Sequence, residues 1–232
     1  MNEIFWWIVF PYITLTIMVV GLLYRYAFRQ TTWAAPSTEI FEKKWLRVGS
    51  TVFHWGIIFA FVGHIMGVLI PLRVYEAIGV SDELYHFFAI AGGGLAGIMV
   101  VLGLIFLLIR KIVNNRVRFH ASFADYFSVI LLLIVAGMGT YMTLGYNLTV
   151  TAYEYRTSIG PWFRSLFMFQ PEAALMREVP LLFQVHIISA FVLFASIPFT
   201  KLVHMFSFPA TYPSRAPQQY RSRSGYRRKS RI

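Results

Sequence analysis

Five long stretches of this sequence contain no lysine, arginine, aspartate or glutamate, and histidine is the only readily charged side chain within them. Each is longer than the roughly 20 residues that an α-helix needs to cross about 30 Å of hydrocarbon. Each is also continuously apolar, whereas a membrane-spanning β-strand alternates apolar and polar positions. These runs occupy residues 4–24, 48–72, 84–109, 126–153 and 179–200.

The pattern predicts an all-α integral membrane protein, built as a five-transmembrane-helix bundle. We expect its helices at about residues 4–24, 49–71, 85–109, 126–147 and 180–206. Only 13% of the residues are charged, about half the share in soluble domains. The sequence therefore predicts one multi-pass domain of the cell membrane over residues 1–206, followed by a basic tail at 207–232.

The loops differ in their basic residues, which mark the cytoplasmic side of a membrane protein. The loops after the first and third helices and the C-terminal tail are strongly basic, whereas the loops after the second and fourth helices balance basic with acidic residues. We therefore expect the N-terminus outside and the C-terminus in the cytoplasm. The net charge of +11 then reflects orientation and contact with anionic lipid head groups, with no nucleic acid as partner.

Cysteine is absent, which excludes a C-x-x-C-H haem attachment, a cysteine-ligated iron–sulfur cluster and a disulfide. Any redox cofactor must therefore be held by other ligands, and histidine is the foremost candidate. The chain has six histidines. Ionisable residues inside a membrane are costly and usually functional, and four histidines lie in the predicted second and fifth helices: His54, His64, His186 and His204.

The depth of these histidines predicts how they pair. The second helix runs outward and the fifth runs back, so His54 and His204 share the cytoplasmic level. His64 and His186 share the outer level. An unbroken fifth helix would place its two histidines on one face, with a bend at Pro198 between them. The arrangement predicts two stacked bis-histidine haems with irons about 20 Å apart, although any single one of these histidines could be an ordinary core residue.

Several segments resemble the gamma subunit of respiratory nitrate reductase. They are FHWGIIFAFVGHIMGVLIP at 53–71, QVHIISAFVLFASIPFTKLVHMFSFP at 184–209, and RYAFRQTTWAAPSTEIFEKKWLRVGS at 25–50. The resemblance implies a cytochrome b subunit with two haem b groups. By matching positions, it implies His64 and His186 as axial iron ligands of the distal haem. It implies His54 and His204 as those of the proximal haem.

The resemblance also implies partners. Menaquinol or ubiquinol would be oxidised near the outer haem, and electrons would leave to an iron–sulfur beta subunit. They would then reach a molybdenum-containing alpha subunit that reduces nitrate in the cytoplasm. For the quinol site the sequence offers His86, at the outer start of the third helix, with Arg73 and Tyr85 as neighbours. Some family members have a lysine in this region, and residues 71–92 contain none.

Three other interpretations stay open on the sequence alone. Quinone-linked subunits of sulfur-redox complexes share the same haem-binding architecture. A haem-free membrane anchor would make the four membrane histidines structural. A transporter using histidine for metal or protons is disfavoured, because neither midplane carboxylates nor internal repeats are evident. We expect His120 to be a surface residue and Asp125 to be a favourable charge at a helix start.

Overall fold

The computed structural model describes residues 2–147 and 153–207. Most of these residues are helical, with no strand among them, and five helices are long and apolar enough to cross a membrane. They span Phe5–Phe28, Lys44–Leu69, Asp82–Val113, Phe123–Tyr146 and Leu181–Phe199. The predicted five-helix membrane fold is confirmed, while the basic tail predicted at 207–232 lies outside the described residues from 208 onward.

The spanning helices carry short irregular turns at their ends. Helix α1 (Phe10–Phe28) follows a π-helical segment at Phe5–Val9, and α2 (Lys44–His64) continues into another at Ile65–Leu69. The remaining three are α4 (Asp82–Val113), α6 (Phe123–Tyr141, extended by a π segment at Met142–Tyr146) and α9 (Leu181–Ser196). Three short helices join them, namely α3 (Leu72–Ala77), α5 (Asn115–Phe119) and α8 (Ile159–Phe167).

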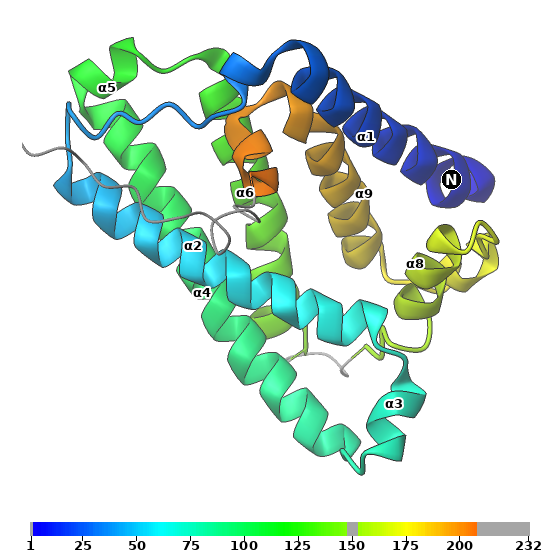
Figure 1. Cartoon of the computed structure of the whole chain (residues 1–232). Helices are drawn as coiled ribbons and strands as arrows, with labels where there is room; N and C mark the ends of the chain where they lie inside the picture. The colour runs from blue at the N-terminus through cyan, green and yellow to red at the C-terminus, as the bar shows by residue number, and fades with distance from the viewer. Residues whose placement is uncertain (1, 148–152, 208–232) are drawn as a thin grey trace, which may run out of the picture.

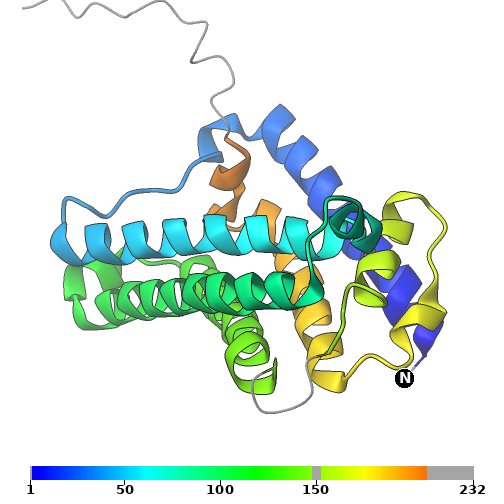
Figure 2. The same cartoon turned by 90° about the horizontal axis from the view of Figure 1, so that it is seen from below.

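The spanning helices pack in the order α2, α4, α6, α9, α1 (Figure 1). Figure 2 shows α2 and α4 running side by side along most of their length. Two glycines allow this close approach, as a Cβ atom on Gly56 would lie 2.8 Å from the Val100 nitrogen. One on Gly103 would lie 2.6 Å from the Phe53 nitrogen. Small residues at such crossings let helix backbones meet in membranes.

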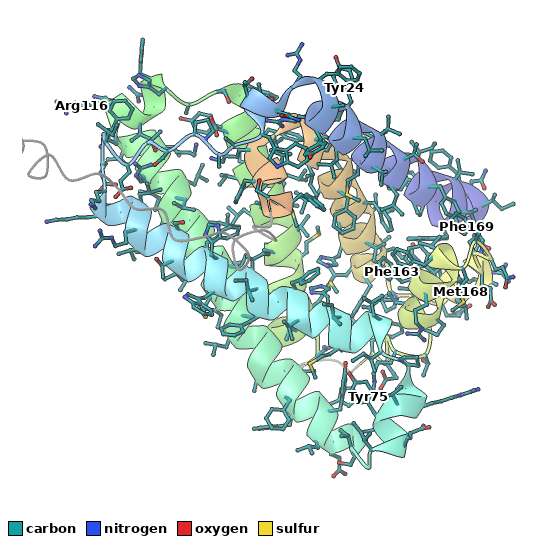
Figure 3. The ribbon with its side chains drawn as sticks, viewed as in Figure 1. Tyr24, Tyr75, Arg116, Phe163, Met168 and Phe169 are labelled. Atoms are coloured by element: carbon teal, nitrogen blue, oxygen red, sulfur yellow. The ribbon has the colours of Figure 1, made fainter. Side chains whose placement is uncertain are left out.

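Aromatic residues close one end of the bundle. Trp162 on α8 is fully buried, and its indole nitrogen donates to the Trp7 carbonyl at 3.0 Å. In Figure 3 the labelled Phe163, Met168 and Phe169 lie at this end, beside the start of α1. Arg116 and Tyr24 lie at the opposite end, among the basic loops. The two ends of the bundle therefore differ in charge as the sequence predicts.

The fifth helix is not continuous, which corrects the helix predicted over 180–206. The α-helix ends at Ser196, and a 3₁₀ turn follows at Ile197–Phe199. Thr200 is extended, with φ −120° and ψ 177°, and a second 3₁₀ segment runs over Lys201–Phe206. The cause is Pro198, which has no N–H to donate and crowds the preceding helical turn. In Figure 1 the chain turns sharply at the end of α9 before the orange segment that carries His204.

Candidate functional site

The structure brings the four membrane histidines together as two pairs. The imidazole rings of His54 on α2 and His204 on the Lys201–Phe206 segment have centroids 6.1 Å apart, with an interplanar angle of 62°. The rings of His64, at the end of α2, and His186 on α9 have centroids 6.4 Å apart and an angle of 18°. The partners in each pair match those expected from membrane depth. His186 and His204 both face α2, as the sequence predicts, but they do so on either side of a break and not from one face of a continuous helix.

In three of these imidazoles the same ring nitrogen, Nδ1, is hydrogen-bonded to a backbone carbonyl. The Nδ1 atoms of His54 and His64 lie 2.7 Å from the carbonyl oxygens of Ser50 and Ala60, one helical turn earlier. The Nδ1 atom of His204 lies 2.6 Å from the Lys201 carbonyl oxygen. A carbonyl oxygen can only accept, so Nδ1 donates and carries the proton. Each ring therefore presents the lone pair of Nε2, the arrangement typical of metal-ligating histidines.

His186 has a different environment. Its Nδ1 atom is buried without a hydrogen-bond partner in the described part of the chain. The ring lies against α6, where a Cβ atom on Gly139 would be 3.2 Å from the His186 Cε1 atom. Glycine at that position therefore leaves room for the imidazole. Buried polar atoms without a partner are uncommon and call for a specific explanation.

An open hollow of about 320 Å³ lies beside His54 and is lined by residues of α2 alone: Ser50, Thr51, His54, Trp55 and Ile58. Within residues 2–147 and 153–207, no group of three or more His, Cys, Asp or Glu side chains could hold a metal ion. A metal bound by these histidine pairs would therefore take its remaining ligands from a non-protein group.

His86 belongs to a charged network at the aromatic-capped end of the bundle. Its Nε2 atom lies 3.2 Å from a carboxylate oxygen of Glu154. Arg156 donates to both Glu154 oxygens, at 2.7 and 2.6 Å, and to Asp82 at 2.9 Å. Its guanidinium group also lies 4.0 Å from the centre of the Tyr85 ring. His86 and its expected neighbour Tyr85 are thus joined through Arg156 and Glu154.

Arg73, the other expected neighbour of His86, is exposed. Its side chain makes no hydrogen bond or ion pair within the described residues. Glu154 and Arg156 were missed as site residues, because their loop was interpreted only by its balanced charges. The one signal was their spacing in Glu-Tyr-Arg, which is too common to identify a site without the fold.

The network also sets the charge state of Glu154. Burial raises the pKa of Glu154, but the hydrogen bonds from Arg156 outweigh it and hold that pKa below its ordinary value. The carboxylate in turn raises the pKa of Arg156. The arginine is nearly fully buried, at 3% exposure, whereas the Glu154 side chain keeps 33%. The pair is therefore ionised, with the carboxylate within reach of both His86 and solvent.

The network contacts α2 near His64. The hydroxyl groups of Tyr85 and Tyr155 lie 2.9 Å apart. A Cβ atom on Gly67, three residues after His64, would lie 2.9 Å from the Tyr155 ring and 3.2 Å from the Tyr85 hydroxyl. Gly67 thus permits the two tyrosines to pack beside the π-helical segment that follows α2. On Gly63, four residues earlier, a Cβ atom would meet nothing within 4 Å.

Two polar residues near the basic loops lie where the sequence suggested. His120 is exposed, with its ring stacked 4.4 Å from that of Phe41. Asp125 begins α6 in a capping box with Ser122. Asp125 also lies 2.9 Å from the Lys201 nitrogen and 3.7 Å from that of Lys111. It therefore ties α6 to the segment that carries His204.

Comparison with known proteins identifies the family. The family described as nitrate reductase gamma subunit matches residues 3–223. The chain is 44% identical to the nitrate reductase gamma chain of Bacillus subtilis, over 94% of this chain and 97% of that one. It is 30% identical to the respiratory nitrate reductase 1 gamma chain of Escherichia coli, over 95% of this chain and 98% of that one. The chain therefore belongs to the nitrate reductase gamma subunit family.

Proposed function

We propose that this membrane subunit is a di-haem cytochrome b that oxidises quinol near the outer face and delivers electrons to cytoplasmic partners. The observation that carries the proposal is the pairing of the four membrane histidines at two levels. Family membership supports a role in a nitrate reductase complex over the sulfur-redox alternative.

The histidine pairs fit the ligation of two haem b groups. A ligating imidazole nitrogen lies about 2 Å from its metal and about 1 Å from its own ring centre, so two imidazoles on opposite sides of one iron have ring centres roughly 6 Å apart. The observed separations are 6.1 and 6.4 Å. His54 and His204 would hold the proximal haem, and His64 and His186 the distal one. Two protein ligands suffice, because a porphyrin supplies the other four.

A haem b with two histidine ligands supplies one-electron transfer without an open site for oxygen. The chain's own contribution is to fix ligand orientation, which the backbone carbonyls at Nδ1 of His54, His64 and His204 do. An iron in the site formed by His64 and His186 would give the buried His186 ring a ligand contact.

The proposed orientation places the N-terminus outside and the basic loops in the cytoplasm. The partners on that side would be an iron–sulfur beta subunit and a molybdenum-containing alpha subunit that reduces nitrate. The charged network of His86, Glu154 and Arg156 then contains the quinol site, with menaquinol or ubiquinol as electron donor. His86 would accept a quinol proton at Nδ1, while the Glu154 carboxylate accepts the Nε2–H and stabilises the imidazolium. Glu154 was not expected from the sequence, and the fold places it beside His86 in the proposed quinol site.

The test is a dithionite-reduced minus oxidised spectrum, with haem quantified per chain, on the complex purified from membranes. Single variants His54→Ala, His64→Ala, His186→Ala and His204→Ala are compared with wild type. His120→Ala is the matched control, because His120 is exposed and lies outside both pairs.

Two haems are expected in the wild type and in the control. His54→Ala and His204→Ala should lose one and the same haem, and His64→Ala and His186→Ala the other. A correctly assembled wild type without haem would leave the membrane-anchor interpretation and reject the electron-transfer proposal. Haem loss that groups His54 with His64 would reject the pairing instead.

A further inference from the structure

The break after α9 leaves backbone carbonyls that no helical turn can satisfy. Thr200 is extended, so the regular hydrogen bonding of the preceding helix stops there. The carbonyl oxygens of Pro198, in the 3₁₀ turn, and of the extended Thr200 lie at this break, and both residues are buried. Buried backbone acceptors need partners, because an unpaired polar group costs about 1–3 kcal/mol or more.

Arg25, in the last turn of α1, supplies those partners. Its Nη1 atom donates to the Pro198 carbonyl at 2.8 Å and to the Thr200 carbonyl at 2.9 Å. The other side of the guanidinium donates to Thr32, with Nε 3.2 Å from its hydroxyl and Nη2 in contact with its carbonyl. One arginine therefore joins the end of α1, the following turn and the break in the fifth helix.

Gly21 brings α1 close enough for these contacts. It lies one helical turn before Arg25 and so faces the same way. A Cβ atom on Gly21 would lie 2.7 Å from the Cγ atom of Pro198, closer than side chains tolerate. Gly21 and Arg25 thus lie on one face of α1, and this face contacts the break in the fifth helix at both residues.

We propose that Arg25 is a positioning residue for His204, and that through His204 it sets the axial coordination of the more cytoplasmic haem. His204 follows Thr200 by four residues, and its Nδ1 atom is bonded to the carbonyl of Lys201, the residue directly after Thr200. The direction in which the chain leaves the break therefore determines where the imidazole lies. This inference rests on the proposed haem ligation.

Arginine is suited to the role for a geometric reason. Its planar guanidinium holds several donors in a fixed fork, whereas lysine offers a compact ammonium on a flexible stem. Lysine at this position can reach one of the carbonyls but cannot hold the Thr32 contacts at the same time. We therefore expect Arg25→Lys to preserve the fold. We also expect it to alter the surroundings of the haem held by His54 and His204.

The test uses the assembled complex in membranes with Arg25→Gln, Arg25→Lys and, independently, Gly21→Val. Haem per chain, low-temperature spectra and the midpoint potential of each haem are measured. Arg29→Gln is the matched control, because Arg29 lies at the same end of α1, is exposed, and has no side-chain partner within the described residues.

We expect Arg25→Gln and Gly21→Val to lose most of the haem held by His54 and His204, or to shift its potential and spectrum. The haem held by His64 and His186 should stay as in wild type. Arg25→Lys should retain both haems but keep a shifted potential for the first. Unchanged spectra and potentials in Arg25→Gln, or equal loss of both haems in it, would overturn the inference. A wild-type complex without haem would instead reject the proposed function on which it rests.

Discussion

The Nε2 atom of His86, in the second turn of α4, lies 3.2 Å from a carboxylate oxygen of Glu154, in the loop that leads to α8. Glutamine at position 154 keeps the shape but removes the negative charge that would stabilise a protonated imidazole. We expect Glu154→Gln to slow quinol-driven reduction of the proposed haems about tenfold or more, because His86 keeps its place and loses only the charge that assists it, out of a typical acid–base contribution of about 10²–10⁴-fold. Stopped-flow reduction by a quinol analogue measures this rate.

The control for that prediction is Glu76→Gln, which removes an exposed acidic residue near the same end without touching the network. The dithionite-reduced spectrum should be unaltered in both variants, since neither residue is a proposed ligand. An unchanged rate of reduction by quinol in Glu154→Gln would show that the network around Glu154 is not part of the quinol site.

The same carboxylate predicts an acid-sensitive contribution to stability. The pKa of Glu154 is lowered in the folded chain, so its contribution is fully present above the unfolded value of about 4.3 and is lost as the pH falls through the folded value. Thermal unfolding of the detergent-solubilised complex between pH 6 and pH 3 should show wild type losing more stability than Glu154→Gln. Parallel curves for the two proteins would contradict the assignment.

Much of this architecture was predictable because a bilayer imposes simple requirements. The five uncharged runs predicted the five spanning helices, and the opposite directions of the second and fifth helices predicted the two histidine pairs. The break at Thr200 was underestimated as a bend, because a proline indicates lost hydrogen bonding but not the conformation that replaces it. Glu154 was missed because its partner His86 lies 68 residues away, and side-chain contacts between loops depend on the fold.

The buried Arg110, in the last turn of α4, and the half-buried Glu42 form an ion pair that joins α4 to the loop before α2. Arg110 is 4% exposed and donates to the Glu42 carboxylate at 2.7 Å, to the Glu42 carbonyl and to two oxygens of Thr38. Losing Arg110 leaves oxygens of Thr38 and Glu42 without their donor, at a cost of about 1–3 kcal/mol, although the Glu42 carboxylate still accepts from the Trp45 and Leu46 N–H groups. We expect Arg110→Met to lower the thermal midpoint strongly.

Pairing that change with Glu42→Gln should recover part of the loss, because the side chain that has lost its arginine partner is then neutral. Arg116→Met, at an exposed site of the same end, should have little effect. If the double variant is no more stable than Arg110→Met, then lost packing and backbone contacts outweigh the stranded charge.

Trp162 is the largest fully buried side chain at the aromatic end. Its ring packs edge-on against Trp7 at 5.6 Å, and its nitrogen donates to the Trp7 carbonyl. Truncation to alanine should cost about 3–5 kcal/mol, from the cavity and from the unpaired carbonyl. Trp162→Phe should cost less, since it keeps most of the volume. Equal thermal midpoints for Trp162→Ala and wild type would show that this cluster does not anchor the end of α1.

Glycines of α4 provide a final test of how α2 is held. On Gly103 a Cβ atom would meet the Phe53 backbone at 2.6 Å, directly before His54, whereas on Gly92 it would meet nothing within 4 Å. Both glycines lie within α4, so alanine gains similar helix propensity at each, about 1 kcal/mol. We expect Gly103→Ala to destabilise the bundle and disturb the haem proposed to bind His54, and Gly92→Ala to be neutral or stabilising. The matched pair isolates helix approach from propensity, so equal thermal midpoints and spectra would show that α2 and α4 can separate without consequence for the site.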